Sequence, residues 1–310
     1  MSRNRLDRLA ALYFVRPARR IFGRPNRLRI PILMYHSVSD DKCKSARPYF
    51  ALQTTTQVFE GHVRYLHENG YTSLSTADVV GLLNCDQAIA KKYVALTFDD
   101  GYRDFYTNAF PILRKYGFTA TVYLPTAYIS ARSRCLLERE CLSWAEVKEL
   151  HKCGVAFGSH TISHTKLEDM REAELEREIR GSKEAIEDKL GTPVRSFAYP
   201  YVFPERDWSF THRLRDLLKV AGYHDGVSKV IGTVQSFEER FFLRRIPANT
   251  GDDNALFKAK LEGDYDWLHG AQATLTLIRR LRSAGTSGQI SGGDLATLPP
   301  RHFNKIESDS

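Results

Sequence analysis

Two adjacent carboxylates, Asp99 and Asp100, directly follow the apolar stretch 94–98. An ionised carboxylate at the end of a buried strand loses its hydration, so it must find a partner or give up its charge. A metal ion held by one carboxylate would supply that partner and would leave the other carboxylate free to take a proton. The pair therefore points to a catalytic metal site.

Two histidines further along the chain, His160 and His164, could complete such a site. In a helical turn their spacing of four points both imidazoles the same way. Neutral imidazole binds zinc, nickel, iron or cobalt, and a carboxylate is a common third ligand. Histidine pairs at this spacing are most often ordinary surface or core residues, but together with the two aspartates they predict a hydrolytic metal site.

The elements that must position these residues alternate between strand and helix about seven times. The predicted strands are 29–36, 71–74, 94–98, 118–124, 155–159, 195–199, 223–228 and 241–246. The predicted helices are 57–68, 76–84, 105–116, 143–154, 171–190, 207–221 and 271–281. This alternation predicts an α/β fold with a parallel sheet that is closed, or nearly closed, as a barrel. Functional residues of such barrels lie where the strands end, so His36, Asp99, Asp100, His160 and the segment 199–201 should converge.

Three motifs in this order resemble a known family. They are T-F-D-D-G at 97–101, S-H-T-I-S-H at 159–164 and F-A-Y-P-Y at 197–201. The chain resembles the polysaccharide deacetylases of carbohydrate esterase family 4, the NodB-homology domain, from about residue 31 to about residue 247. The resemblance implies a distorted (β/α)7-type barrel and a metal-dependent hydrolase that removes acetyl groups from N-acetylated amino sugars of a polysaccharide, oligosaccharide or glycolipid.

The resemblance also implies roles for individual residues. Asp100, His160 and His164 would hold a divalent metal ion, with zinc as the first candidate and cobalt, nickel or iron as alternatives. Asp99 would act as the general base that takes a proton from the attacking water. The backbone amide of Tyr201 would stabilise the oxyanion of the tetrahedral intermediate.

The general acid is less directly indicated, because the late strand 241–247 lacks the histidine that many family members carry there. The segment L-M-Y-H at 33–36 resembles the opening strand of a rearranged branch that includes poly-N-acetylglucosamine deacetylases. We therefore assign the acid to His36, the alternative being a histidine hydrogen-bonded in the core. Asp225, on a later strand, is expected to orient His36 or to close the pocket.

Two positions depart from the pattern of many family members. Ala198 stands where many members have an arginine beside the catalytic base, so Asp99 is expected to lack that partner. Val202 stands where a glycine usually follows the tyrosine, and a β-branched residue resists a positive φ angle. The local turn that carries the oxyanion contact should therefore differ.

Charge is concentrated at one end of the chain. Residues 1–30 contain nine arginines and one acid, Asp7, so their net charge is +8. The net charge of all 310 residues is also +8. The remainder is neutral, which argues against nucleic-acid binding by the folded body. Leu6, Leu9, Leu12 and Tyr13 recur at helical spacing among the arginines, so residues 1–28 could lie on an anionic membrane. A disordered or loosely docked basic arm is the alternative.

The remaining features predict organisation and location. No stretch has the roughly 18–20 apolar residues that cross a bilayer, and arginines interrupt any secretory signal. We therefore expect a cytoplasmic protein, either free or at the inner membrane face. Five cysteines without a C-x-x-C pair indicate reduced thiols. We expect a basic arm at 1–28, a deacetylase domain at 29–265, a C-terminal helix at 266–282 and a disordered tail at 283–310.

Three functional interpretations follow from the sequence. The first is N-deacetylation of a glycan or a lipid-linked saccharide. The second is removal of O-acetyl groups by the same site, since metal and base act on the carbonyl and not on the leaving atom. The third is a carbohydrate-binding protein that has lost turnover, against which the complete set Asp99, Asp100, His160 and His164 argues.

Overall fold

A computed structural model describes residues 5–22, 29–41, 52–84, 91–131, 134–201, 207–234 and 236–270. The predicted helix 271–281, the predicted tail 283–310 and Val202 lie outside these ranges.

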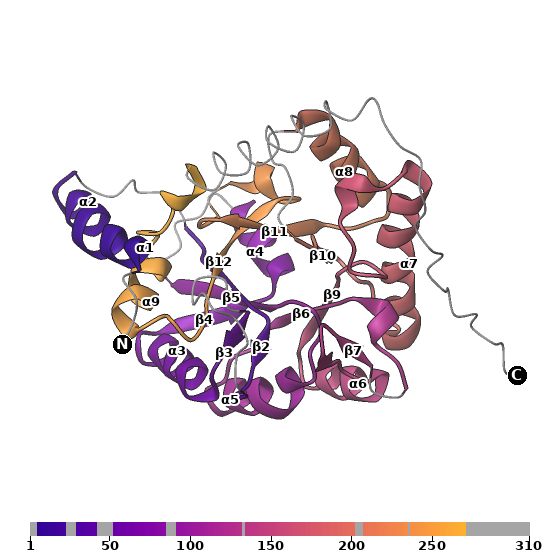
Figure 1. The fold of residues 1–310 in the computed structure, drawn as a ribbon, viewed down its shortest axis with the longest axis horizontal. Coiled ribbons are helices and arrows are strands. Elements are labelled where there is room, and N and C mark those ends of the chain that lie inside the picture. The colour runs from indigo at the N-terminus through magenta and orange to yellow at the C-terminus, as the bar shows by residue number, and fades with distance from the viewer. Residues whose placement is uncertain are drawn as a thin grey trace, which may run out of the picture. The chain divides into compact units, whose positions relative to one another are not determined.

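Seven parallel strands form a closed barrel (Figure 1). They are β1 (Ile32–Tyr35), β5 (Lys92–Phe98), β6 (Thr121–Leu124), β9 (Ala156–Ser159), β10 (Ser196–Ala198), β11 (Asp225–Ile231) and β12 (Leu243–Pro247). The order is β1-β12-β11-β10-β9-β6-β5, and β1 closes the ring by pairing with β5 from Ile32–Ala95 to Tyr35–Phe98. An eighth strand, β4 (Tyr71–Leu74), pairs with the first half of β5. The predicted barrel is confirmed.

Helices follow most of the strands, as the alternation predicts. They are α3 (Thr56–Glu68), α4 (Thr76–Leu83), α5 (Phe110–Lys115), α6 (Trp144–Lys152), α7 (Glu172–Leu190) and α8 (Trp208–Val220). Ser75 and Ser143 close capping boxes at the starts of α4 and α6, and Gly191 ends α7 in the left-handed conformation with φ 68°. A wider π turn, Phe105–Ala109, precedes α5.

Some short elements lie where neither a strand nor a helix was predicted from the sequence. They are β2 (Ser37–Val38), β3 (Gln53–Thr54), the hairpin of β7 (Cys135–Leu136) with β8 (Arg139–Glu140), and helix α9 (Asn254–Leu261). Asp253 caps α9 by accepting a hydrogen bond from the backbone of Leu256. With only eight residues and no strong apolar period, α9 gives a weak sequence signal.

Alternation along the strands separates two apolar clusters. Leu33, Tyr35 and Phe98 pack outward against the helices, whereas Ile32, Ala95, Tyr123 and Leu243 pack inside the barrel. Successive side chains of a strand point to opposite faces, so residues two apart share a face. Asp99 is therefore in phase with Ala95, and His36 is in phase with Ile32. The strand phases aim both side chains toward the barrel axis.

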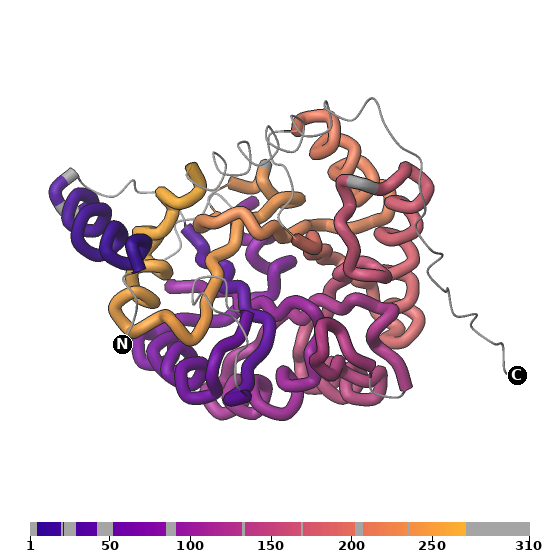
Figure 2. Tube along the Cα trace, in the orientation of Figure 1, coloured from indigo at the N-terminus to yellow at the C-terminus, as the bar shows by residue number. Residues whose placement is uncertain are grey.

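The N-terminal helix packs against the C-terminal part of the same barrel (Figures 1 and 2). It consists of α1 (Leu6–Leu9), a π turn (Ala10–Val15) and α2 (Arg16–Phe22). Its arginines pair with carboxylates in and around α9: Arg5 with Asp252 at 3.2 Å, Arg8 with Asp253 at 2.7 Å, Arg16 with Glu262 at 3.0 Å and Arg19 with Asp264 at 3.3 Å. Residues 5–22 therefore form a docked helix and not a disordered arm. Among the described residues, no helix is both long enough and apolar enough to cross a membrane.

Candidate active site

Three ligand-type side chains meet at the carboxyl ends of β5 and β9. Oδ1 of Asp100 lies 3.4 Å from Nε2 of His160 and 3.1 Å from Nε2 of His164. The three atoms lie within 4.8 Å of one another, and all three residues are buried. The structure thus brings together the three residues that the sequence analysis named as metal ligands.

The donor atoms of this cluster fit a divalent metal ion. Asp100 Oδ1, His160 Nε2 and His164 Nε2 have no hydrogen-bond partner among the described residues, although all are buried. Nδ1 of His160 lies 2.8 Å from the carbonyl oxygen of Ala198 and donates to it, which leaves Nε2 unprotonated for a metal. Burial lowers the pKa of His160 and keeps its ring neutral. Burial opposes ionisation of Asp100, but His160 and His164 hold its pKa well below the usual range.

The backbone between the two histidines is not the helical turn that the sequence analysis assumed. Thr161 and His164 have φ angles of 68° and 54°, in the left-handed region. Glu178 of α7 holds this loop, since its buried carboxylate accepts hydrogen bonds from the backbone N–H groups of Ile162 at 2.8 Å and Ser163 at 2.9 Å. Glu178 is not recognisable from the sequence, because it lies among many charged residues of a long helix.

Asp99 has an arginine partner, contrary to the expectation from Ala198. The guanidinium of Arg245, on β12, donates two hydrogen bonds to the carboxylate at 2.6 and 2.8 Å, and both side chains are fully buried. Arg245 also donates to the backbone oxygen of Ser228 and to Thr97 Oγ1. Burial alone would raise the pKa of Asp99, but Arg245 holds it well below the usual range. Asp99 therefore remains ionised and can accept a proton.

His36 lies beside this pair. Its Nε2 is 3.8 Å from Oδ2 of Asp99 and 3.4 Å from Nζ of Lys229, which is on β11. Burial, and next the charge of Lys229, lower the pKa of His36 to about 4, so the ring is neutral at neutral pH. Neither Lys229 nor Arg245 is among the site residues predicted from the sequence. Their signal is their strand phase, in step with Val227 and Leu243 inside the barrel.

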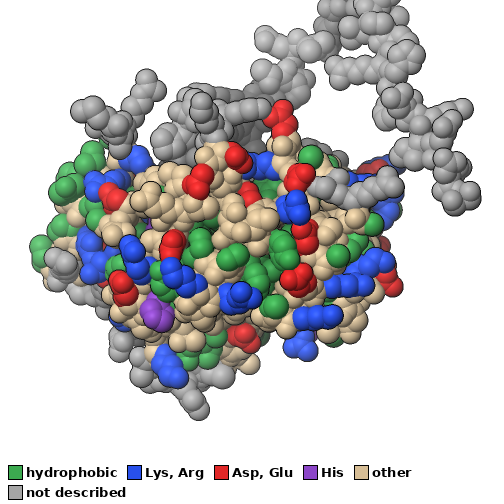
Figure 3. All heavy atoms as spheres, turned by 90° about the horizontal axis from the view of Figure 1, so that it is seen from below, with side chains coloured by type: hydrophobic (Ala, Val, Ile, Leu, Met, Phe, Trp, Pro, Cys, Tyr) green, Lys and Arg blue, Asp and Glu red, His purple; other side chains and the backbone are tan. Residues whose placement is uncertain are grey.

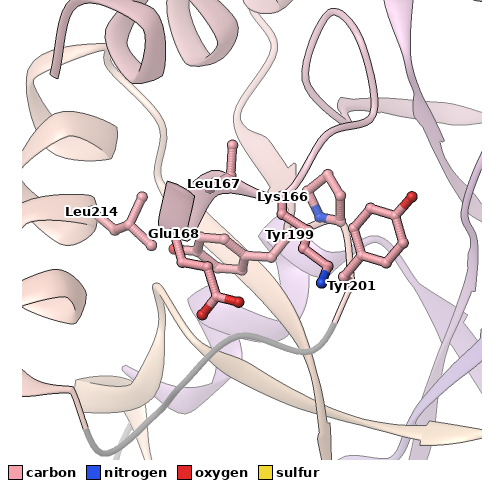
Figure 4. A pocket seen from close by; sticks show the side chains of 7 residues that line it. Lys166, Leu167, Glu168, Tyr199, Tyr201 and Leu214 are labelled. Carbon is pink, nitrogen blue, oxygen red and sulfur yellow. The ribbon is translucent and has the colours of Figure 1, made fainter. Parts of the chain in front are cut away.

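Tyr201 lies at the rim of the metal cluster. Its φ is 59°, its side chain is 40% exposed, and its ring centroid is 5.1 Å from that of His164. Figure 4 shows Tyr199 pointing toward Leu214 and Tyr201 pointing the opposite way. The pocket drawn there has room for about one water molecule, so it is not a sugar site. Tyr201 itself adopts the left-handed conformation that the sequence analysis discussed for Val202.

A family model described as polysaccharide deacetylase matches residues 86–225, which include Asp99, Asp100, His160, His164 and Tyr201. The chain therefore contains a domain of the polysaccharide deacetylase type within residues 86–225. It is 28% identical over 234 residues to YxkH of Bacillus subtilis, a proposed polysaccharide deacetylase, and the match covers 76% of each chain. It is also 30% identical over 139 residues to the poly-beta-1,6-N-acetyl-D-glucosamine N-deacetylase of Escherichia coli. That match covers 42% of this chain but spans only a fifth of the Escherichia coli enzyme's own length.

Solved structures agree with this assignment. The deacetylase PplD of Streptococcus pyogenes, determined in complex with acetate, superposes with a TM-score of 0.66 and 25% sequence identity. The superposition covers 76% of this chain and 99% of PplD. The chain is therefore a hydrolase of the deacetylase type, and it retains an Asp-His-His cluster suited to a metal ion.

Asp225 of the deacetylase neither orients His36 nor closes the pocket, contrary to the prediction. It begins β11 at the end of the barrel opposite the metal cluster and accepts a hydrogen bond from Ser196 Oγ. The hydroxyl groups of Tyr123 and Thr76 join this buried group. Burial raises the pKa of Asp225 to about 7. The residue thus belongs to a polar group at the amino-terminal end of the strands, away from His36.

A polar pocket of about 370 Å³ lies beside β2 and the β7–β8 hairpin. Arg103, Asp104 and Arg139 are among the residues that line it. The guanidinium of Arg139 donates to Ser37 Oγ at 2.8 Å, and Ser37 directly follows His36 in the chain. This volume and this polar lining suit a sugar ring.

Proposed function

We propose that this polysaccharide deacetylase removes acetyl groups from N-acetylated amino sugars of a polysaccharide, oligosaccharide or glycolipid. The main support is the cluster of Asp100, His160 and His164, whose buried ligand atoms have no hydrogen-bond partner among the described residues. The ionised carboxylate of Asp99 lies next to this cluster. The name of the Escherichia coli relative supports the amide substrate. A metal ion at this cluster, for which we propose zinc, would polarise the acetyl carbonyl and acidify a water molecule.

Residues of the chain carry out the remaining steps of the proposed reaction. Asp99, held by Arg245, takes the proton of the attacking water. The backbone N–H of Tyr201 donates to the oxyanion of the tetrahedral intermediate. His36 delivers a proton to the nitrogen as the carbon–nitrogen bond breaks. The pocket beside Arg139 holds the neighbouring sugar ring.

Acetate release from N-acetylglucosamine oligomers tests the proposal, with mass spectrometry to detect the loss of an acetyl group. The wild-type protein should release acetate. Asp99→Asn should lose this activity and keep its metal, because the base is gone but the ligands remain. His160→Ala should lose both. The exposed Asp188 provides the matched control Asp188→Asn, which should behave as wild type.

Acetate release by Asp99→Asn at the wild-type rate would contradict the assigned base. O-acetylated sugars assayed in parallel distinguish N-deacetylation from the esterase alternative. The esterase alternative predicts turnover of the ester without turnover of the amide. A metal-loaded protein that turns over neither substrate would favour the carbohydrate-binding alternative.

We also propose that the deacetylase works in the cytoplasm at an anionic membrane surface, on a lipid-linked saccharide, and that α1 and α2 make the contact. Five of the eleven exposed large hydrophobic side chains in the described residues lie on this helix, among them Leu6 at 77%, Phe14 at 73% and Ile21 at 77%. Hydrophobic side chains stand beside Lys and Arg at the left edge of Figure 3, the side on which α1 and α2 lie in Figure 1. The nine arginines of residues 1–30 outnumber the five carboxylates of residues 252–266. Apolar exposure with excess positive charge favours anionic lipid.

Cosedimentation with phosphatidylglycerol vesicles tests the membrane contact. The double variant Tyr13→Ser, Phe14→Ser should bind these vesicles more weakly than wild type, because it removes apolar area from the exposed face. Trp208→Ser is the matched control, since Trp208 is 75% exposed on α8. Point variants are preferable to deletion of the helix, because deletion would leave the buried Asp252 and Asp264 without Arg5 and Arg19. Equal binding by the double variant and wild type would exclude this face as the anchor.

A further inference from the structure

We propose that Lys229 supplies the proton that His36 passes to the leaving amine, so that the acid of this deacetylase is a lysine–histidine pair. The inference rests on the proposed function. Lys229 does not contact the scissile bond in this scheme. It acts through His36 as a positioning residue that also protonates the imidazole ring.

The contact between the two residues has a defined direction. Nζ of Lys229 lies 3.4 Å from Nε2 of His36. An ammonium group has three donors and no acceptor, so the imidazole nitrogen accepts in this pair. His36 Nε2 also lies 3.8 Å from the carboxylate of Asp99, which places this nitrogen between the lysine and the base. The burial of His36 keeps the ring neutral, as the lowered pKa indicates.

The other charged groups near His36 are unsuited to supply a proton. They are Asp99 and Asp100 after β5 and Arg245 on β12. Asp99 is the base of the proposed mechanism and is bound by Arg245, and Asp100 belongs to the metal cluster. Arg245 is bound to Asp99 through two hydrogen bonds, and a guanidinium does not release its proton in proteins. Among the described residues, Lys229 is the remaining cation near His36.

The proposed sequence balances in atoms and electrons. The oxygen of water bonds to the acetyl carbon, and the proton of that water passes to Asp99. The carbon–nitrogen bond then breaks, and its electron pair stays on the nitrogen. Nε2 of His36, which carries no proton in the neutral ring, takes the proton of the Lys229 ammonium and passes it to that nitrogen. Lys229 regains a proton from solvent and Asp99 releases one, so one amide and one water yield an amine and acetic acid.

A comparison of leaving groups tests the inference. An amine must be protonated as it leaves, whereas the nitrophenolate of 4-nitrophenyl acetate leaves without a proton. The readout is the ratio of kcat for N-acetylglucosamine oligomers to kcat for 4-nitrophenyl acetate. In Lys229→Met this ratio should fall about 100-fold, the low end of what general acid catalysis contributes. KM for the oligomers should stay near the wild-type value.

Lys229→Arg separates proton supply from charge. Arginine keeps the positive charge but cannot release a proton, so its ratio should fall as far as that of Lys229→Met. Lys189→Met, on the exposed end of α7, is the matched control and should keep the wild-type ratio. Metal content and the unfolding midpoint are measured for every variant to verify that each is folded.

Each result decides the matter. A wild-type ratio in Lys229→Arg would show that charge alone is sufficient and would overturn the inference. An equal loss on both substrates in Lys229→Met, or a change confined to KM, would also overturn it in favour of a structural or substrate-binding role. If the wild-type protein cleaves neither substrate, the proposed function fails and this inference falls with it. Failure of the proposed function is distinguishable from failure of this inference alone, because it is seen with the wild-type protein before any variant is compared.

Discussion

Arg245 and Asp99 form a pair that is fully buried and joined by two short hydrogen bonds. The arginine comes from β12, while Ala198 of β10 fills the place where many members of the family have an arginine. A delocalised guanidinium with two parallel donors matches a carboxylate in geometry as well as in charge. The pair keeps Asp99 ionised with an arginine that comes from β12 and not from the segment 197–201.

Removal of Arg245 should be costly, because it leaves the charge of Asp99 buried and unpaired. We expect Arg245→Met to lower the free energy of unfolding by about 3–5 kcal/mol. The double variant Arg245→Met, Asp99→Asn should recover part of this loss. Urea denaturation measures both. Arg244→Met is the matched control, since Arg244 is half-buried and pairs with Glu239 near the surface. An equal loss in the two single variants would show that the buried pair contributes nothing specific.

The sequence could identify residues at strand ends but not those within strands. His36, Asp99, Asp100 and His160 each follow an apolar run, so their position was visible. Lys229 and Arg245 lie inside β11 and β12, where only the phase of the strand decides which side chain faces the barrel interior. Arg244 and Arg245 are adjacent and identical in type. Only the phase set by Leu243, two residues earlier, shows that Arg245 is the one that points inward.

At the scale of elements, α7 controls the loop that carries two metal ligands. Its residue Glu178 is buried, and its carboxylate holds the backbone of Ile162 and Ser163 between His160 and His164. Two residues of this loop have positive φ angles, which costs roughly 1–3 kcal/mol each unless the surroundings compensate. The spacing of the histidines was visible in the sequence, but the carboxylate that shapes their loop was not.

Loss of this carboxylate should weaken metal binding. We expect Glu178→Ala to raise the dissociation constant of the metal about 10–100-fold, because the loop loses the acceptor that orients it. Glu178→Gln should retain much of the affinity, since its amide oxygen can still accept from the backbone. Competition with a chelator measures both variants. Glu184→Ala, an exposed residue of the same helix, serves as the control. Wild-type affinity in Glu178→Ala would refute this role for the carboxylate.

At the scale of the whole molecule, Asp225 makes the stability of the barrel depend on pH. Its folded pKa of about 7 lies above the value of 3.8 for a free aspartate. The folded state then binds the proton more tightly than the unfolded state does, so stability falls as pH rises from about 4 to about 7. A shift of this size corresponds to roughly 4 kcal/mol in total.

Substitution of Asp225 should remove this dependence. We expect the free energy of unfolding of Asp225→Asn to decline less between pH 5 and pH 8 than that of wild type. Urea denaturation at both pH values provides the measurement. Asp216→Asn, an exposed position on α8, should decline as wild type does. Parallel curves for Asp225→Asn and wild type would place the titrating group elsewhere.

The number of alternating elements was enough to predict the barrel, because a parallel sheet needs crossover helices and leaves few other arrangements. The docking of the N-terminal helix could not be predicted in the same way. Arg5 and Asp252 are separated by 247 positions, and each looks like an ordinary surface charge in its own segment. Only the closure of β1 against β12 brings the two segments together.

This long separation has a consequence for synthesis. Arg5 and the exposed apolar face of its helix are made before Asp252, Asp264 and their neighbours. At about 5–20 residues per second, the interval between them is on the order of 10–50 s. Throughout that interval the N-terminal helix has none of these carboxylate partners. The nascent chain thus carries a cationic, apolar segment that can meet a lipid surface before the barrel has closed.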